Sequence, residues 1–190
     1  MTLLEKAKSG EITAEMQYVA EKEGVTPEFI CEGVAKGEIV ILHSSRKNIH
    51  PVAVGKGLFT KVSASVGMYE AADTIDGEMA KIDAAVKAHA DTIMDLSVRG
   101  PIGEMREKVL STVDRPVGTL PMYETLSVAE AKYGTALDMT PDDLFDMIEK
   151  QASQGVAFIA LHPGTTLSVI HRAKDEGRID PLVSYGGSHP

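Results

Sequence analysis

The chain has 190 residues, 43% of them hydrophobic and 25% charged, which is typical of one soluble globular domain or of a domain with a small extension. Its net charge of −9 and its lack of Trp argue against nucleic-acid binding, which uses stripes of Lys and Arg and aromatic platforms for bases. Cys31 is the only cysteine, which excludes an intrachain disulfide, and without a membrane-length apolar run or a signal-peptide pattern we expect a protein of the cytoplasm that binds no membrane.

Residues 1–54 are expected to form a helical leader with a short strand and a loop. The run Thr26-Pro27-Glu28 is typical of a helix start, because it combines a hydroxyl N-cap, a proline at the first helical position and an acid in the first turn. Gly37 would end that helix. Residues 38–42 predict a short strand, and the polar stretch 43–54 predicts a loop.

From residue 55 onward, strand-like and helix-like segments alternate. Ile75, Met79, Ile82 and Val86, for example, recur at the spacing of an amphipathic helix. The predicted strands cover 58–67, 91–97, 115–123, 156–161 and 181–184, and the predicted helices cover 75–86, 101–109, 140–155 and 167–174.

This alternation indicates an α/β fold of parallel strands with helical crossovers, at a spacing typical of the (β/α)8 TIM barrel. About eight strands close such a barrel, whereas the pattern predicts only the first five β/α units, in residues 55–190. A truncated barrel, an open sheet and one part of an assembly all fit this pattern.

Polar residues and glycines follow each predicted strand, at the end where parallel α/β folds bind their ligands. The clusters are Ser63, Ser65 and Gly67; Met94, Asp95 and Ser97, with Arg99 beyond; Tyr123; His162; and Ser184 to Ser188. Each also has a plainer interpretation as a solvated loop, a packed side chain or, for Asp95, a cap on the next loop. The Gly-Gly run between hydroxyls favours a phosphorylated small molecule, but the residues specify no reaction.

Six segments of the chain, in this order, resemble the ThiC family of phosphomethylpyrimidine synthases in thiamine biosynthesis. The resemblance covers nearly the whole chain. The segments that carry it are Lys61–Gly67, Ala90–Ser97, Pro116–Tyr123, Gln151–Val156, His162–Gly164 and Val183–Ser188.

The resemblance implies a (β/α)8 barrel enzyme that uses S-adenosylmethionine and a [4Fe-4S] cluster. Members of the ThiC family rearrange 5-aminoimidazole ribonucleotide by radical chemistry to 4-amino-5-hydroxymethyl-2-methylpyrimidine phosphate, and similar relatives make 5-hydroxybenzimidazole from the same substrate. Tyr123 and His162 would then hold the ribonucleotide, and the run from Ser184 would lie near its phosphate. The implied substrate-binding residues are Ser65, Met94, Tyr123, His162, Ser184, Tyr185 and Gly186.

The chain also departs from the family pattern. The family has asparagine in place of Ser65 and arginine in place of Tyr185, and an arginine beside a phosphate is a bidentate, permanently charged donor. The family's later Asp-Gly-Leu-Arg motif, its metal-binding histidines and its cysteine triplet have no counterpart here. We therefore expect that this chain alone binds no cofactor and does not perform the reaction.

Three interpretations follow from the resemblance and the departures. The chain could be one piece of a ThiC-type lyase, a cluster-free relative that binds a phosphorylated ligand, or a non-catalytic assembly partner. Because open sheet edges invite pairing, we expect a homo-oligomer or a companion chain that supplies the missing strands.

Overall fold

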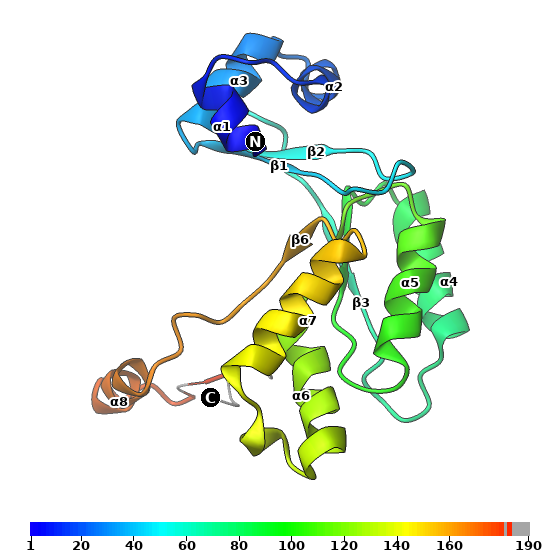
Figure 1. Cartoon of the computed structure of the whole chain (residues 1–190), viewed down its shortest axis with the longest axis vertical. Coiled ribbons are helices and arrows are strands. Elements are labelled where there is room, and N and C mark those ends of the chain that lie inside the picture. The colour runs from blue at the N-terminus through cyan, green and yellow to red at the C-terminus, as the bar shows by residue number, and fades with distance from the viewer. Residues whose placement is uncertain (181, 184–190) are drawn as a thin grey trace.

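The computed structural model describes residues 1–180 and 182–183. Three helices and a β-hairpin form a leader lobe, residues 1–55, which lies above a parallel α/β unit (Figure 1). No helix within the described part of the chain has both the length and the apolar character needed to cross a membrane.

The leader lobe begins with three helices, each of which starts at a threonine whose side chain accepts a backbone hydrogen bond. The predicted helix start at Thr26-Pro27 is confirmed, and Gly37 takes a left-handed conformation (φ 72°) just beyond the end of that helix. The helices are α1 (Leu3–Lys8), α2 (Ala14–Glu23) and α3 (Pro27–Ala35).

The expectation that 43–54 is a loop is wrong at its C-terminal end. Strand β2 (Val52–Gly55) pairs antiparallel with the predicted strand β1 (Ile39–Leu42). Ala53 is 1% exposed and packs into the core of the leader lobe. The strand is only four residues long, follows Pro51 and ends in Gly55, so its short apolar run carries little periodic signal.

The α/β unit is built on a parallel sheet whose strands are ordered β3-β4-β5-β6. These strands are β3 (Ser63–Val66), β4 (Thr92–Asp95), β5 (Val117–Thr119) and β6 (Phe158–Ile159). The helices between them are α4 (Ile75–Lys87), α5 (Ile102–Thr112), α6 (Pro121–Tyr133) and α7 (Pro141–Ser153), with the 3-10 turn η1 (Ala136–Asp138) before α7. An α/β fold with a parallel sheet is thus confirmed.

Helices cover one face of this sheet. Val66, Ile93 and Val117 on three strands share a buried core with Ile82 of α4 and Val109 of α5. The alternate residues of β3, Ser63 and Ser65, point to the opposite face and are exposed. Within the described chain, then, the sheet has one packed face and one open face.

The predicted strand 115–123 is wrong at its C-terminal end. Strand β5 stops at Thr119, and Pro121 begins α6, so Tyr123 lies in a helix. Proline suits the first helical position because it lacks an N–H that this turn would leave unpaired anyway. The sequence pattern shows no helix here because α6 buries polar residues beside apolar ones, including Glu124 and Thr125, which hides the stripe.

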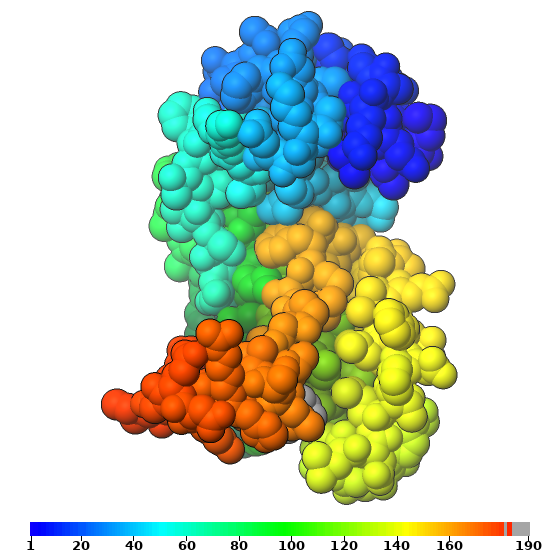
Figure 2. All heavy atoms as spheres, turned by 90° about the vertical axis from the view of Figure 1, so that its left-hand side faces the viewer, coloured from blue at the N-terminus to red at the C-terminus, as the bar shows by residue number. Residues whose placement is uncertain are grey.

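The last described elements project from the rest of the molecule. Helix α8 (Leu167–Asp175) is confirmed as a helix, but none of its residues is buried. Figure 2 shows its residues, coloured orange to red, standing out from the body. The predicted strand 181–184 reaches outside the described residues at both ends and stays a prediction.

Candidate functional site

The open face of the parallel sheet brings two of the predicted site residues together. Ser65 of β3 lies directly opposite Met94 of β4, and Met94 lies opposite Gly118 of β5. Gly118 in turn lies opposite Phe158 of β6. A hydroxyl, a thioether and an aromatic ring therefore form one row across the sheet.

Gly118 makes room for the ring in this row. A Cβ atom at this position would lie 2.2 Å from Cε2 of Phe158, well inside contact distance. The glycine therefore allows the Phe158 ring to lie over β5.

Tyr123 and His162 follow the C-terminal ends of the next two strands. Tyr123 lies in the first turn of α6, its backbone N–H donates to the Leu120 carbonyl (3.0 Å), and its side chain is buried. His162 is half-buried in the segment that follows β6. Because neighbouring parallel strands end at one edge, both residues belong to the same edge as Ser65 and Met94. Ser184, Tyr185 and Gly186 lie outside the described residues.

The loop that follows β3 is held by two buried acceptors. Glu78 of α4 is 1% exposed, and its Oε2 accepts the Gly67 N–H at 2.8 Å. The Oγ of Ser97 accepts the Met68 N–H at 3.0 Å. These bonds hold the backbone two and three residues beyond Ser65, the first to α4 and the second to the segment after β4.

Asp95 anchors the end of β4. Its Oδ1 accepts both the backbone N–H (3.0 Å) and the hydroxyl (2.6 Å) of Ser97. Burial raises the pKa of Asp95, although the hydrogen bonds from Ser97 oppose this effect. The interpretation of Asp95 as the cap of the next loop is confirmed.

A buried polar network lies behind the sheet, on its helix-covered face. The guanidinium of Arg106, 1% exposed, donates to both carboxylate oxygens of Glu124 on α6. Gln151 of α7 donates to Glu124 at 2.8 Å and accepts from the Thr119 hydroxyl at 2.6 Å. The network thereby ties α5, α6 and α7 to the end of β5.

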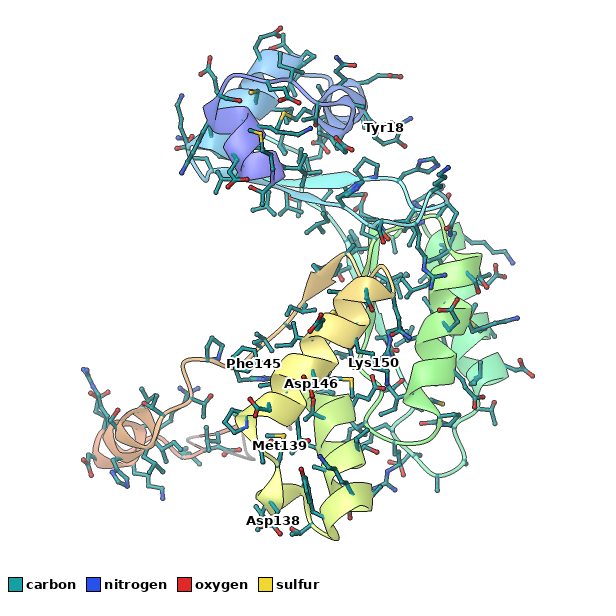
Figure 3. All side chains as sticks on the ribbon, in the orientation of Figure 1. Tyr18, Asp138, Met139, Phe145, Asp146 and Lys150 are labelled. Atoms are coloured by element: carbon teal, nitrogen blue, oxygen red, sulfur yellow. The ribbon has the colours of Figure 1, made fainter. Side chains whose placement is uncertain are left out.

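The neighbouring cations Arg106 and Lys150 set the ionisation of Glu124 in this network. Burial by itself would raise the pKa of Glu124, but the hydrogen bonds from Arg106 and from Lys150 (3.0 Å; labelled in Figure 3) outweigh it and hold that pKa below its usual range.

Sequence reasoning missed the buried charges at Glu78, Arg106 and Glu124. One signal could have found the first of them. Glu78 stands three residues after Ile75 and four before Ile82, so the helical period places its carboxylate on the buried face of α4. A charge on an apolar stripe predicts a buried partner.

Comparisons with known proteins show the family of this chain. A sequence model of the radical SAM ThiC family matches residues 2–190. The chain belongs to this family. It is 94% identical over 189 residues to the 5-hydroxybenzimidazole synthase BzaA of Eubacterium limosum and 57% identical over 190 residues to BzaA of Moorella thermoacetica. It is 48% identical over 189 residues to the phosphomethylpyrimidine synthase of Thermoanaerobacter sp. strain X514.

These matches cover all or nearly all of this chain but only part of each relative. The chain spans 44% of the length of each of these three proteins. Their whole-protein activity therefore comes to this chain as a proposal.

The residues present do not fit the [4Fe-4S] cluster that the radical SAM family implies. Such a cluster needs several thiolates, and Cys31 is the only cysteine of the 190 residues. Its thiol is buried in the leader lobe, where it donates to the carbonyls of Ala7 (3.7 Å) and Glu11 (3.9 Å). Nor do the residues at 1–180 and 182–183 contain a group of three or more His, Cys, Asp or Glu side chains placed to hold a metal ion.

Proposed function

We propose that this chain is the N-terminal part of a 5-hydroxybenzimidazole synthase that acts on 5-aminoimidazole ribonucleotide. The observation that carries the proposal is the 94% identity with BzaA of E. limosum, against 48% with a phosphomethylpyrimidine synthase. The thiamine-pathway reaction, which gives the pyrimidine phosphate, is the second candidate because those relatives also match 99% of the chain. Either enzyme would work in the cytoplasm.

We further infer that the described sheet is part of a (β/α)8 barrel. The strands follow one another in chain order, β3-β4-β5-β6, and all are parallel. A doubly wound sheet instead reverses its strand order and carries helices on both faces. Parallel sheets are normally covered on both faces, so the open face that carries Ser65 and Met94 supports a barrel interior.

The remaining strands would come from another part of the enzyme, from a second copy or from a companion chain. Strand β6 is only two residues long and ends the described sheet order, so its outer edge offers unpaired backbone groups to a further strand.

Within such a barrel, the residues of the site edge would bind and orient the ribonucleotide. The hydroxyl of Ser65 would donate or accept one hydrogen bond, and the thioether of Met94 would pack against a ring. Tyr123 and His162 would hold the substrate from the next two strand ends. The loop anchors Glu78 and Ser97 would keep Ser65 in place without contacting the ligand.

Calorimetric titration with 5-aminoimidazole ribonucleotide tests the binding half of this proposal. Tyr123→Phe removes only the phenolic hydroxyl, and we expect it to weaken binding by about tenfold, the cost of one hydrogen bond to a charged or polar ligand group. Tyr133→Phe, at the other end of α6, is the matched control and should bind as the wild type does. Equal binding by both variants would contradict the role of Tyr123.

The product tests the reaction. The complete enzyme, supplied with reductant and S-adenosylmethionine without oxygen, should release 5-hydroxybenzimidazole, identified by mass spectrometry. Release of the pyrimidine phosphate instead would overturn the assignment in favour of the second candidate.

A further inference from the structure

A cavity lies at the end of the parallel sheet opposite the site edge. It has a volume of about 390 Å³ and sits between α2 of the leader lobe and the segments that precede β3, β4 and β5. Tyr18, labelled in Figure 3, is on its lobe side. The charged side chains that line the cavity are Lys22, Glu23, Lys61, Asp91, Asp114 and Arg115. The volume falls within the range of about 300–1,000 Å³ that small-molecule sites occupy.

The carboxylates around this cavity are already engaged or face solvent. Glu23 is paired with Lys61 at 2.8 Å, and its other oxygen accepts the Phe59 N–H at 2.8 Å. Asp91 accepts the Val62 N–H at 2.7 Å. The side chain of Asp114 is 58% exposed. Two of these acids already pair with cations of the cavity, Glu23 with Lys61 and Asp114 with Arg115.

The cations, by contrast, retain donors. The Lys61 side chain is only 11% exposed, and its ammonium donates to Glu23 and to the Phe59 carbonyl, which uses two of its three N–H groups. The Nε of Arg115 is buried, yet it has no hydrogen-bond partner among the residues at 1–180 and 182–183. The Asp114 carboxylate lies 3.7 Å away, too far for a hydrogen bond. Buried donors without acceptors are rare, so this Nε calls for an acceptor that the described residues do not supply.

An aromatic wall and a third cation complete the surroundings. The rings of Tyr18 and His50 stack with centroids 5.5 Å apart and planes at 13°. The ammonium of Lys22 lies 5.4 Å from the centre of the Tyr18 ring, at the mouth of the cavity. The cavity thus combines cationic donors with an apolar, planar surface.

We propose that this cavity binds a small organic oxyanion, a phosphate or a carboxylate, whose oxygen atoms accept from Arg115 and Lys61. Arginine and lysine both bind such groups through charge-assisted hydrogen bonds. The ligand would join α2 to the segment that enters β5, and would therefore hold the leader lobe against the sheet. The inference is independent of the reaction assigned to the opposite end of the strands.

Titration followed by backbone amide NMR tests this site. The purified protein is titrated separately with inorganic phosphate and with acetate, at an ionic strength held constant with sodium chloride. We expect saturable shifts of the amides of His50, Lys61 and Arg115 with one or both anions, and the more tightly bound anion identifies the ligand class. Arg115→Gln should weaken that binding by about tenfold or more.

Two further variants keep the result interpretable. Arg178→Gln removes an exposed arginine far along the chain and should leave binding unchanged. If Arg115→Gln fails to fold, Lys22→Glu reverses an exposed charge at the cavity mouth and should still weaken binding. The proposal is overturned if neither anion saturates in the millimolar range, if the shifts scatter over surface lysines, or if the cavity variants bind as the wild type does; the cavity would then hold water only.

Discussion

Replacing Arg106 by methionine would test whether the network behind the sheet holds the helices in place. The guanidinium is 1% exposed and bonds both oxygens of Glu124, while its Nε donates to the Gln154 side chain at 2.8 Å. Methionine fills a similar space but donates no hydrogen bond. The change therefore leaves the Glu124 carboxylate buried without its main counter-charge.

Removing one partner of a buried ion pair typically costs about 3–5 kcal/mol. Glu124 would keep two partners, Lys150 at 3.0 Å and Gln151 at 2.8 Å. We therefore expect Arg106→Met to lower the free energy of unfolding by about 3 kcal/mol, the low end of that range.

Urea denaturation followed by circular dichroism measures this loss. The double variant Arg106→Met/Glu124→Leu should recover part of it, because an apolar pair leaves no unpaired charge. A loss below about 1 kcal/mol for the single variant, together with additive effects in the double variant, would refute the argument, since the pair would then act like an exposed salt bridge.

The pH dependence gives a second check on the same pair. The pKa of Glu124 is held low in the folded protein, so its stabilising contribution is present above its unfolded pKa and is lost as the pH falls through the folded value. Without Arg106, the pKa of Glu124 in the folded protein should lie closer to its unfolded value. The stability gap between wild type and Arg106→Met should therefore narrow below about pH 4.

Two further predictions concern the ends and the open face of the sheet. The pKa of Asp95 is raised in the folded protein, so the carboxyl group's contribution to stability is full below its unfolded pKa and is lost as the pH rises through the folded value. Asp95→Asn should remove this loss. Between about pH 4 and pH 7, the urea midpoint of the variant should therefore rise relative to that of the wild type. If the urea midpoints of the wild type and Asp95→Asn changed identically with pH, this expectation would be contradicted. Gly118→Ala places a Cβ 2.2 Å from the Phe158 ring and should cost about 1–3 kcal/mol in the same assay, whereas an unchanged midpoint would show that the ring moves freely.

The candidate site was only partly predictable from the sequence. The sequence pattern predicts Ser65 and Met94 near strand ends, and the structure sets them directly opposite each other on β3 and β4. The same pattern predicts a strand at Tyr123, but this residue lies in α6. The error has a physical cause: Pro121 is compatible with both the end of a strand and the first turn of a helix, and only the packing of α6 decides between them.

Local patterns determined the elements that depend on local forces. The threonine caps, the Thr-Pro helix starts and the apolar stripe from Ile75 to Val86 each act within a few residues, so the sequence alone predicts α3, α4 and α7 and the alternation that indicates a parallel sheet. The family resemblance is likewise a property of the sequence, and the match over residues 2–190 confirms it.

Tertiary structure alone decided what depends on distant partners. The ion pair between Arg106 and Glu124 spans 18 positions, and that between Glu23 and Lys61 joins α2 to the segment before β3. A buried charge is favourable only when a group of opposite charge is buried against it. No periodicity in the local sequence shows which residue that group belongs to. For the same reason, the cavity beside Arg115 exists only once the leader lobe has packed against the sheet.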